Sequence, residues 1–133
     1  MGSYLALSVI APAGDLIRSG KKTLEIRQWA PETLPLRNLV IIQNTKRLSR
    51  DGLHEDTEGK VMALVDVDSV EEWKECEFEE ACASFWEEGW LAWKLSNIRP
   101  LYFQEQFPAR LRLYPIDLPA IGTKAVTSGA PAE

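Results

Sequence analysis

The chain has 133 residues, two cysteines and a formal net charge of −5, with 45% hydrophobic and 26% charged residues. This length is typical of one domain that buries its core without disulfides or metals. No apolar run approaches the ~20 residues that span a membrane, and the first residues lack the basic, apolar and small-residue order of an export signal. We therefore expect a single cytoplasmic domain that does not associate with membranes.

The charge is unevenly distributed along the chain. Residues 1–50 carry eight Lys and Arg against three Asp and Glu, whereas residues 51–95 carry three against fourteen. The negative total argues against a protein that grips long stretches of nucleic acid through phosphates. The basic first third favours an anionic ligand, although a solvated mosaic of charges would have the same composition.

In the first half of the chain, apolar alternation and one continuous apolar run predict three strands. These strands are expected at residues 5–9, 23–29 and 38–43, the last being the central strand. Pro12 and Gly20 suit the start and the end of a short helix over residues 13–19. Pro31 and Pro35 predict a loop before the third strand.

In the second half, residues 44–59 are polar and predict a mobile loop. Three further alternating segments predict strands at residues 61–67, 91–95 and 110–114. An apolar stripe at helical spacing predicts a second helix, ended by Gly89, whose buried face is Phe78, Ala81, Cys82, Phe85 and Trp86. Residues 118–133 predict a disordered tail, which leaves residues 1–117 as the domain.

The stretch from Gly20 to Trp29 has the highest density of functional groups in the chain. Alternation from Thr23 onward places Glu25, Arg27 and Trp29 on the polar face of one strand. Glu25 and Arg27 should therefore lie side by side and pair. Lys22 is in the turn at the end of this row, where we expect a lysine to contribute little packing.

Several other kinds of site do not fit the sequence. His54 is the only histidine and lies in an acidic loop, which removes histidine triads and zinc sites. Cys76 and Cys82 lack partners at metal-ligand spacing and are expected to be idle or buried thiols. A phosphate-binding P-loop at residues 19–23 would need the order strand, loop, helix, and the order here is helix, turn, strand. We expect no metal and no cofactor.

The candidate catalytic residues are Lys22, Glu25 and Arg27. A lysine acts as a general base where burial or a neighbouring cation lowers its pKa, and Lys21 and Arg27 supply cations. Glu25 could orient that lysine or carry a proton itself, and Arg27 could bind a phosphate or hold Glu25 in place. The alternative is structural, a salt-bridged strand end that braces the fold.

Aromatic and polar residues add candidates for ligand binding. Trp29 shares the polar face with the motif and could stack on a base, although a role in the core or as a loop anchor fits equally well. A second polar segment follows the predicted strand at residues 91–95. The candidate ligand-binding residues are Lys21, Trp29, Ser96, Asn97 and Arg99.

The spacing of Gly20, Lys22, Glu25 and Arg27 fits G-x-K-x-x-E-x-R, and with it the chain resembles the ASCH family of PUA-like domains. The order of the surrounding segments resembles the family as well, over about residues 4–114. The resemblance implies an α+β fold, a small mixed PUA-like β-barrel of five to six strands with two or three short flanking helices. It also implies a cleft beside the motif that binds RNA or a modified nucleoside.

The resemblance further implies possible activities, both of them metal-independent hydrolyses. Some ASCH members cleave RNA, and others hydrolyse the acetyl amide of N4-acetylcytidine. The amidohydrolases have a threonine where Glu25 stands, whereas ribonuclease-type members keep the lysine and the glutamate. The acidic insert after Val70 and the tail after Pro119 have no family counterpart. The alternative function is a non-catalytic adaptor, in which the acidic segment from Asp51 to Glu88 docks a basic protein partner and the motif only braces the barrel.

Overall fold

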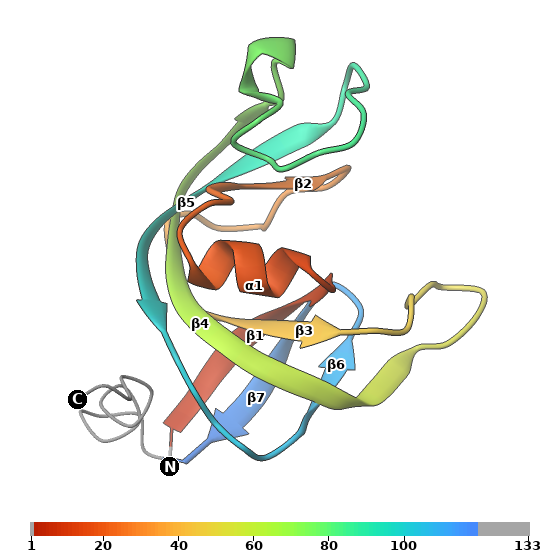
Figure 1. Cartoon of the computed structure of the whole chain (residues 1–133), viewed down its shortest axis with the longest axis vertical. Helices are drawn as coiled ribbons and strands as arrows, with labels where there is room; N and C mark the ends of the chain where they lie inside the picture. The colour runs from red at the N-terminus through yellow and green to blue at the C-terminus, as the bar shows by residue number, and fades with distance from the viewer. Residues whose placement is uncertain (1, 120–133) are drawn as a thin grey trace.

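The computed structural model describes residues 2–119, which form seven strands, one α-helix and one 3₁₀ turn (Figure 1). The elements in chain order are β1 (Gly2–Ile10), α1 (Ala13–Arg18), β2 (Leu24–Arg27), β3 (Leu36–Asn44), β4 (Glu55–Glu72), η1 (Glu75–Glu77), β5 (Leu91–Pro100), β6 (Phe107–Arg110) and β7 (Leu113–Leu118). The fold is therefore mostly β, with few helices. The described residues end at Pro119, one position after β7, so almost all of the predicted tail lies outside them.

The strands form one sheet in the order β2-β5-β4-β3-β1-β7, and β6 pairs with the first residues of β4. Only β1 and β3 run parallel, and the other pairs are antiparallel. Within residues 2–119 no ladder joins β2 to β7, so the sheet is open. The prediction of five to six strands was too low, and the closed barrel is not confirmed.

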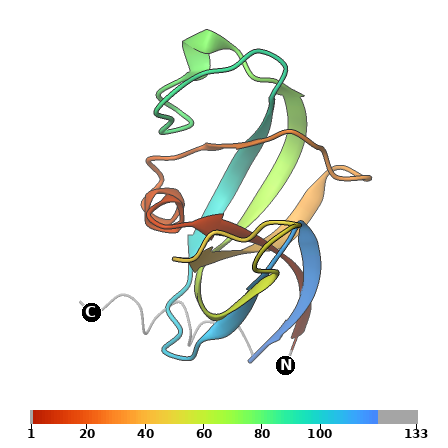
Figure 2. The ribbon, with the colours of Figure 1, turned by 90° about the vertical axis from the view of Figure 1, so that its right-hand side faces the viewer.

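The first predicted helix and the predicted central strand are both confirmed. The run from Leu39 to Ile42 in β3 is fully buried, and β3 and β4 occupy the middle of the sheet. α1 lies in the concave side of the curved sheet, where Ile17 is fully buried in the main core (Figures 1 and 2). Apolar runs of this length are continuous because both faces of the central strands are covered.

The second predicted helix, over residues 78–89, is wrong. The short η1 ends before them at Glu77, these residues form turns and irregular segments, and Cys82 has a left-handed backbone with φ of 52°. The carbonyl of Glu80 accepts hydrogen bonds from the backbone N–H groups of Thr23 and Leu24, and this tie to β2 takes the place of a helical bond. Ala81 is buried as predicted, but Phe85 is 54% exposed. We call residues 73–90 the tryptophan lobe, because it packs Trp73 and Trp86 around Leu24.

The predicted strand at residues 110–114 is also broken in the structure. β6 ends at Arg110 and β7 begins at Leu113, because the two strands pair with different neighbours, β4 and β1. Arg112, in the turn between them, has a φ of 58°. Arg110 at the end of β6 and Arg112 in the turn are both exposed.

Candidate functional site

A cleft of about 430 Å³ opens between the tryptophan lobe and the β6–β7 turn, with β2 between them. Figure 1 shows the lobe at the upper end of the molecule and the β6–β7 turn below β2, and Figure 2 shows the same order from the side. The end of β1, the start of α1 and the loop after β3 complete the wall. The volume lies in the range of clefts that hold one small ligand.

The three candidate catalytic residues meet in this cleft. Glu25 is only 7% exposed, and its Oε2 accepts a hydrogen bond of 2.9 Å from Arg27 Nε. Its other oxygen, Oε1, lies 3.5 Å from Lys22 Nζ. The predicted pairing of Glu25 with Arg27 is confirmed, because residues two apart on a strand share a face.

Besides pairing with Glu25, Lys22 and Arg27 each donate a hydrogen bond to a backbone carbonyl. Lys22 Nζ donates a hydrogen bond of 2.5 Å to the carbonyl of Ala81 in the lobe. Arg27 Nη2 donates one of 2.6 Å to the carbonyl of Ser8 in β1. Lys22, Glu25 and Arg27 therefore link the lobe to β1 of the sheet. Lys22, expected as a loosely packed turn residue, is 7% exposed, because the turn after α1 directs its side chain under the lobe.

The cleft is strongly basic although the whole chain has a net charge of −5. Among the described residues that line it, Glu25 is the only carboxylate, against the cations Lys22, Arg27, Arg47, Arg110 and Arg112. Sequence reasoning missed the last three as site residues. Arg47 was visible only as part of the basic first third, and the other two only as the polar alternation of a predicted strand.

Aromatic side chains from the lobe form the opposite part of the cleft. Phe85 and Trp90 contact each other edge to face, with ring centroids 5.8 Å apart, and both line the cleft. Phe85 was predicted to lie on the buried face of a helix, so its exposure differs from the prediction. A stripe at helical spacing carries no signal that one of its members faces a cleft.

Two candidate ligand-binding residues lie outside the cleft lining. Trp29 packs edge to face on Trp93, with centroids 4.9 Å apart, and the guanidinium of Arg112 covers its ring at 4.0 Å. Trp29 thus anchors a loop to the core and lies behind a cleft arginine. Lys21 is exposed at the turn, and its carbonyl accepts a weak contact from Cys82 Sγ at 3.7 Å.

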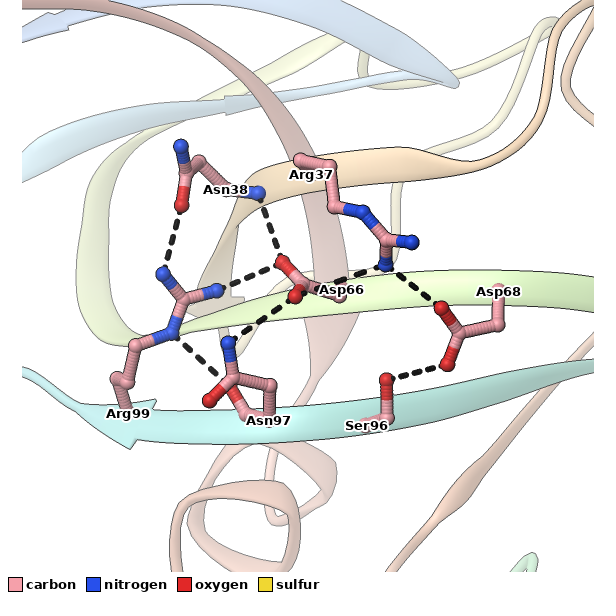
Figure 3. Close-up of polar contacts among 7 residues, drawn as sticks. All are labelled: Arg37, Asn38, Asp66, Asp68, Ser96, Asn97 and Arg99. Carbon is pink, nitrogen blue, oxygen red and sulfur yellow. Dashed lines mark hydrogen bonds and ion pairs between the residues drawn. The ribbon is translucent and has the colours of Figure 1, made fainter.

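The other three candidates, Ser96, Asn97 and Arg99, belong to a separate network on β3, β4 and β5 (Figure 3). We call it the Asp66 cluster, and its members are Arg37, Asn38, Asp66, Asp68, Ser96, Asn97 and Arg99. None of these residues lines the cleft. The structure therefore does not bring them together with the motif.

The Asp66 cluster holds two irregularities of the sheet. Asp66 is 7% exposed and accepts hydrogen bonds from the Asn38 backbone N–H, the Asn97 side chain and Arg99 Nη2, at 3.1, 3.1 and 2.7 Å. Asn38 and Asn97 have left-handed backbones at register shifts of β3 and β5 against β4. The bonds to Asp66 satisfy the polar groups that such bulges leave unpaired.

This environment also changes the titration of Asp66. Burial raises the pKa of its carboxyl group. The hydrogen bonds from Asn38 and Asn97 and the positive charges of Arg99 and Arg37 outweigh burial and hold the pKa below its ordinary value. The carboxylate is therefore stabilised by the fold, which is the behaviour of a structural anion.

The described residues contain neither a metal-binding cluster nor a membrane-spanning helix. Within residues 2–119, no three side chains of His, Cys, Asp or Glu are grouped so that they could hold a metal ion. In the same range, none of the helices has the length and apolar character needed to cross a bilayer.

The motif strand lines a basic cleft at one edge of an open, mostly β sheet. The family model for the ASCH domain matches residues 7–113, so this chain belongs to the ASCH domain family, a family of PUA-like, RNA-binding folds. A comparison with curated proteins gives no match.

The chain is also similar to crystal structures of ASCH from Zymomonas mobilis. A serine-to-alanine mutant of that protein is 20% identical, with a TM-score of 0.46, and the match covers 81% of this chain and 87% of the other. The structure described as ASCH is 17% identical, with a TM-score of 0.43 and the same two coverages.

Proposed function

We propose that the cleft binds single-stranded RNA or a modified nucleoside. The observation that carries the proposal is the charge of the lining, which is positive on a chain whose total charge is −5. An anionic ligand would be drawn to this part of the surface and repelled from the acidic segment around the lobe. The exposed ring of Phe85 offers a face on which an unstacked base can lie.

The finer proposal is hydrolysis of the bound ligand by the motif residues. Lys22 and Glu25 both line the cleft, and they are 3.5 Å apart. In such a pair the lysine would stabilise an anion that develops on the ligand, and the glutamate would move a proton. Geometry supports binding more directly than turnover, because both residues also bridge the lobe and the sheet.

Binding is tested with a panel of short single-stranded RNAs and free nucleosides, including N4-acetylcytidine. Trp73 and Trp90 line the cleft, so quenching of intrinsic fluorescence is a suitable signal, with calorimetry as confirmation. We expect Arg27→Gln to weaken binding at least ten-fold, since a charge-assisted contact is worth about 1.5–3 kcal/mol. The matched control is Arg37→Gln, which removes the same charge from the Asp66 cluster and should bind like the parent.

Two results would count against this function. If no member of the panel binds, or if Arg27→Gln and Arg37→Gln have the same affinity as the parent, the cleft is not the ligand site. Binding of a basic protein to the acidic segment, with no nucleic acid bound, would support the adaptor instead. Turnover is measured on the same panel by product analysis, and Glu25→Gln should abolish it while binding is retained.

A further inference from the structure

The cleft has two chemically different ends, and this difference indicates which chemical groups its ligand carries. The tryptophan lobe, which supplies Phe85 and Trp90 to the lining, lies on one side of β2. The β6–β7 turn and the loop after β3, which supply Arg112 and Arg47, lie on the other side (Figure 1). Glu25 and Arg27 belong to β2 and so lie between these two ends. One end therefore offers apolar ring faces, and the other offers guanidinium groups.

The arginines of the cleft differ in whether a carboxylate forms an ion pair with them. Arg27 pairs with Glu25, and Arg110 Nε lies 2.6 Å from Glu55 Oε2. Arg47 and Arg112 form no ion pair with any residue of the described chain, 2–119. Both are exposed. The cleft thus contains two guanidinium groups whose charge no carboxylate of the described chain compensates.

Arg112 is also held in place by an aromatic ring, and its guanidinium donates no hydrogen bond to any residue of the described range 2–119. Its guanidinium lies over the Trp29 ring at 4.0 Å, and the ring is in turn packed against Trp93. A guanidinium stacked in this way keeps its in-plane N–H groups available. Planar N–H donors of this kind pair best with the oxygens of a phosphate or carboxylate.

The inference from these observations specifies the ligand of the proposed function and rests on that function. We infer that the cleft recognises a phosphorylated nucleotide rather than a free nucleoside, with the phosphate held by Arg47 and Arg112 and the base against Phe85. The volume of about 430 Å³ suits one nucleotide unit and is too small for a duplex. The ligand is then a mononucleotide, or one phosphate-bearing unit of a single strand.

The experiment compares each common ribonucleoside with its 5′- and 3′-monophosphates, by calorimetry on the full chain. We expect at least one monophosphate to bind ten-fold or more tightly than its nucleoside, and this preference to shrink as salt rises. Arg47→Gln and Arg112→Asn should each reduce the preference several-fold, asparagine being chosen because it tolerates the left-handed backbone at position 112. A thermal melt of each variant establishes that it is folded.

Two further variants separate the ends of the cleft. Phe85→Ala should weaken nucleoside and nucleotide about equally, roughly ten-fold for a lost stacking contact, and so leave the preference unchanged. Arg50→Gln is the matched control, because it removes the same charge from the loop that carries Arg47 without touching the cleft lining.

The outcomes distinguish this inference from the function it rests on. Nucleosides that bind as tightly as their monophosphates, with Arg47→Gln and Arg112→Asn unchanged, would overturn the phosphate assignment and leave the cleft as a nucleoside site. If no RNA, nucleoside or nucleotide binds at all, the proposed function and the inference both fall. An equal loss of preference in Arg50→Gln would mean that the effect is one of general charge, and would also overturn the assignment.

Discussion

Replacing Lys22 by methionine tests whether the motif lysine is part of the structure as well as of the site. Its side chain is 9% exposed, donates a hydrogen bond of 2.5 Å to the Ala81 carbonyl and lies 3.5 Å from Glu25 Oε1. Methionine keeps the length and the apolar stem of the side chain but removes the ammonium group. Lys21→Met is the matched control, since it removes the same charge from the neighbouring, exposed position.

The expected loss follows from the partners that the substitution leaves behind. A hydrogen bond from a charged donor contributes about 1.5–3 kcal/mol, and a buried carbonyl without a partner costs about 1–3 kcal/mol. Glu25 keeps its bond of 2.9 Å to Arg27, so it is not left as an isolated buried charge. The methionine stem retains most of the apolar contact. We therefore expect Lys22→Met to lower the free energy of unfolding by about 2–3 kcal/mol, and Lys21→Met by less than about 0.5 kcal/mol.

Urea unfolding followed by circular dichroism measures both values. The midpoint should fall for Lys22→Met at an unchanged slope, which would show that stability changed and the denatured state did not. Equal midpoints for the two variants would refute the reasoning, because the buried hydrogen bond to the lobe would then contribute nothing. Loss of ligand binding in Lys22→Met without loss of stability would show that the lysine acts on the ligand alone.

Three further outcomes are expected. Because the folded state holds the pKa of Asp66 below its ordinary value of 3.8, its stabilisation is complete above that value and is lost as the pH falls through the folded pKa. Asp66→Asn should therefore lower the melting temperature at neutral pH and reduce the fall of the melting temperature in acid. Thermal melts from about pH 6 to pH 2 measure this dependence. A variant whose melting temperature falls with pH as steeply as that of the parent would contradict the prediction. A Cβ at Gly59 would lie 2.5 Å from the Phe107 carbonyl oxygen, so Gly59→Ala should cost on the order of 2 kcal/mol in urea unfolding. In Gly52→Ala the nearest atom is the movable Ser49 hydroxyl, at 2.8 Å, and a loss as large as that of Gly59→Ala would contradict the steric explanation. The Ser8 hydroxyl lies 3.0 Å from the Tyr114 hydroxyl and accepts a hydrogen bond of 3.0 Å from the backbone N–H of Arg110. Ser8→Ala removes both contacts and should lower the free energy of unfolding by about 1 kcal/mol in the same assay. No loss would contradict this prediction.

The local sequence determined those features that depend on residues close in the chain. The spacing of apolar residues was enough to predict β1 and β3, because burial of one face or both faces imposes a period on each strand, and Pro12 and Gly20 were enough to predict α1 between them. The pairing of Glu25 with Arg27 was predictable for the same reason, since it needs only the geometry of one strand. The family motif, four positions within eight residues, is equally local.

The tertiary structure alone decided which distant residues share the cleft. Arg112 joins the motif only because β6 and β7 pair with different strands and leave a turn at the end of β1. Ser96 and Arg99 lie on β5, which pairs with the motif strand β2, yet their hydrogen bonds to Asp68 and Asp66 of β4 place them in the Asp66 cluster and outside the cleft. In the tryptophan lobe, the backbone bonds from β2 to Glu80 replace the helix that local spacing favoured. Such choices depend on pairing and loop closure between segments far apart in sequence, and the period of a single segment carries no information about them.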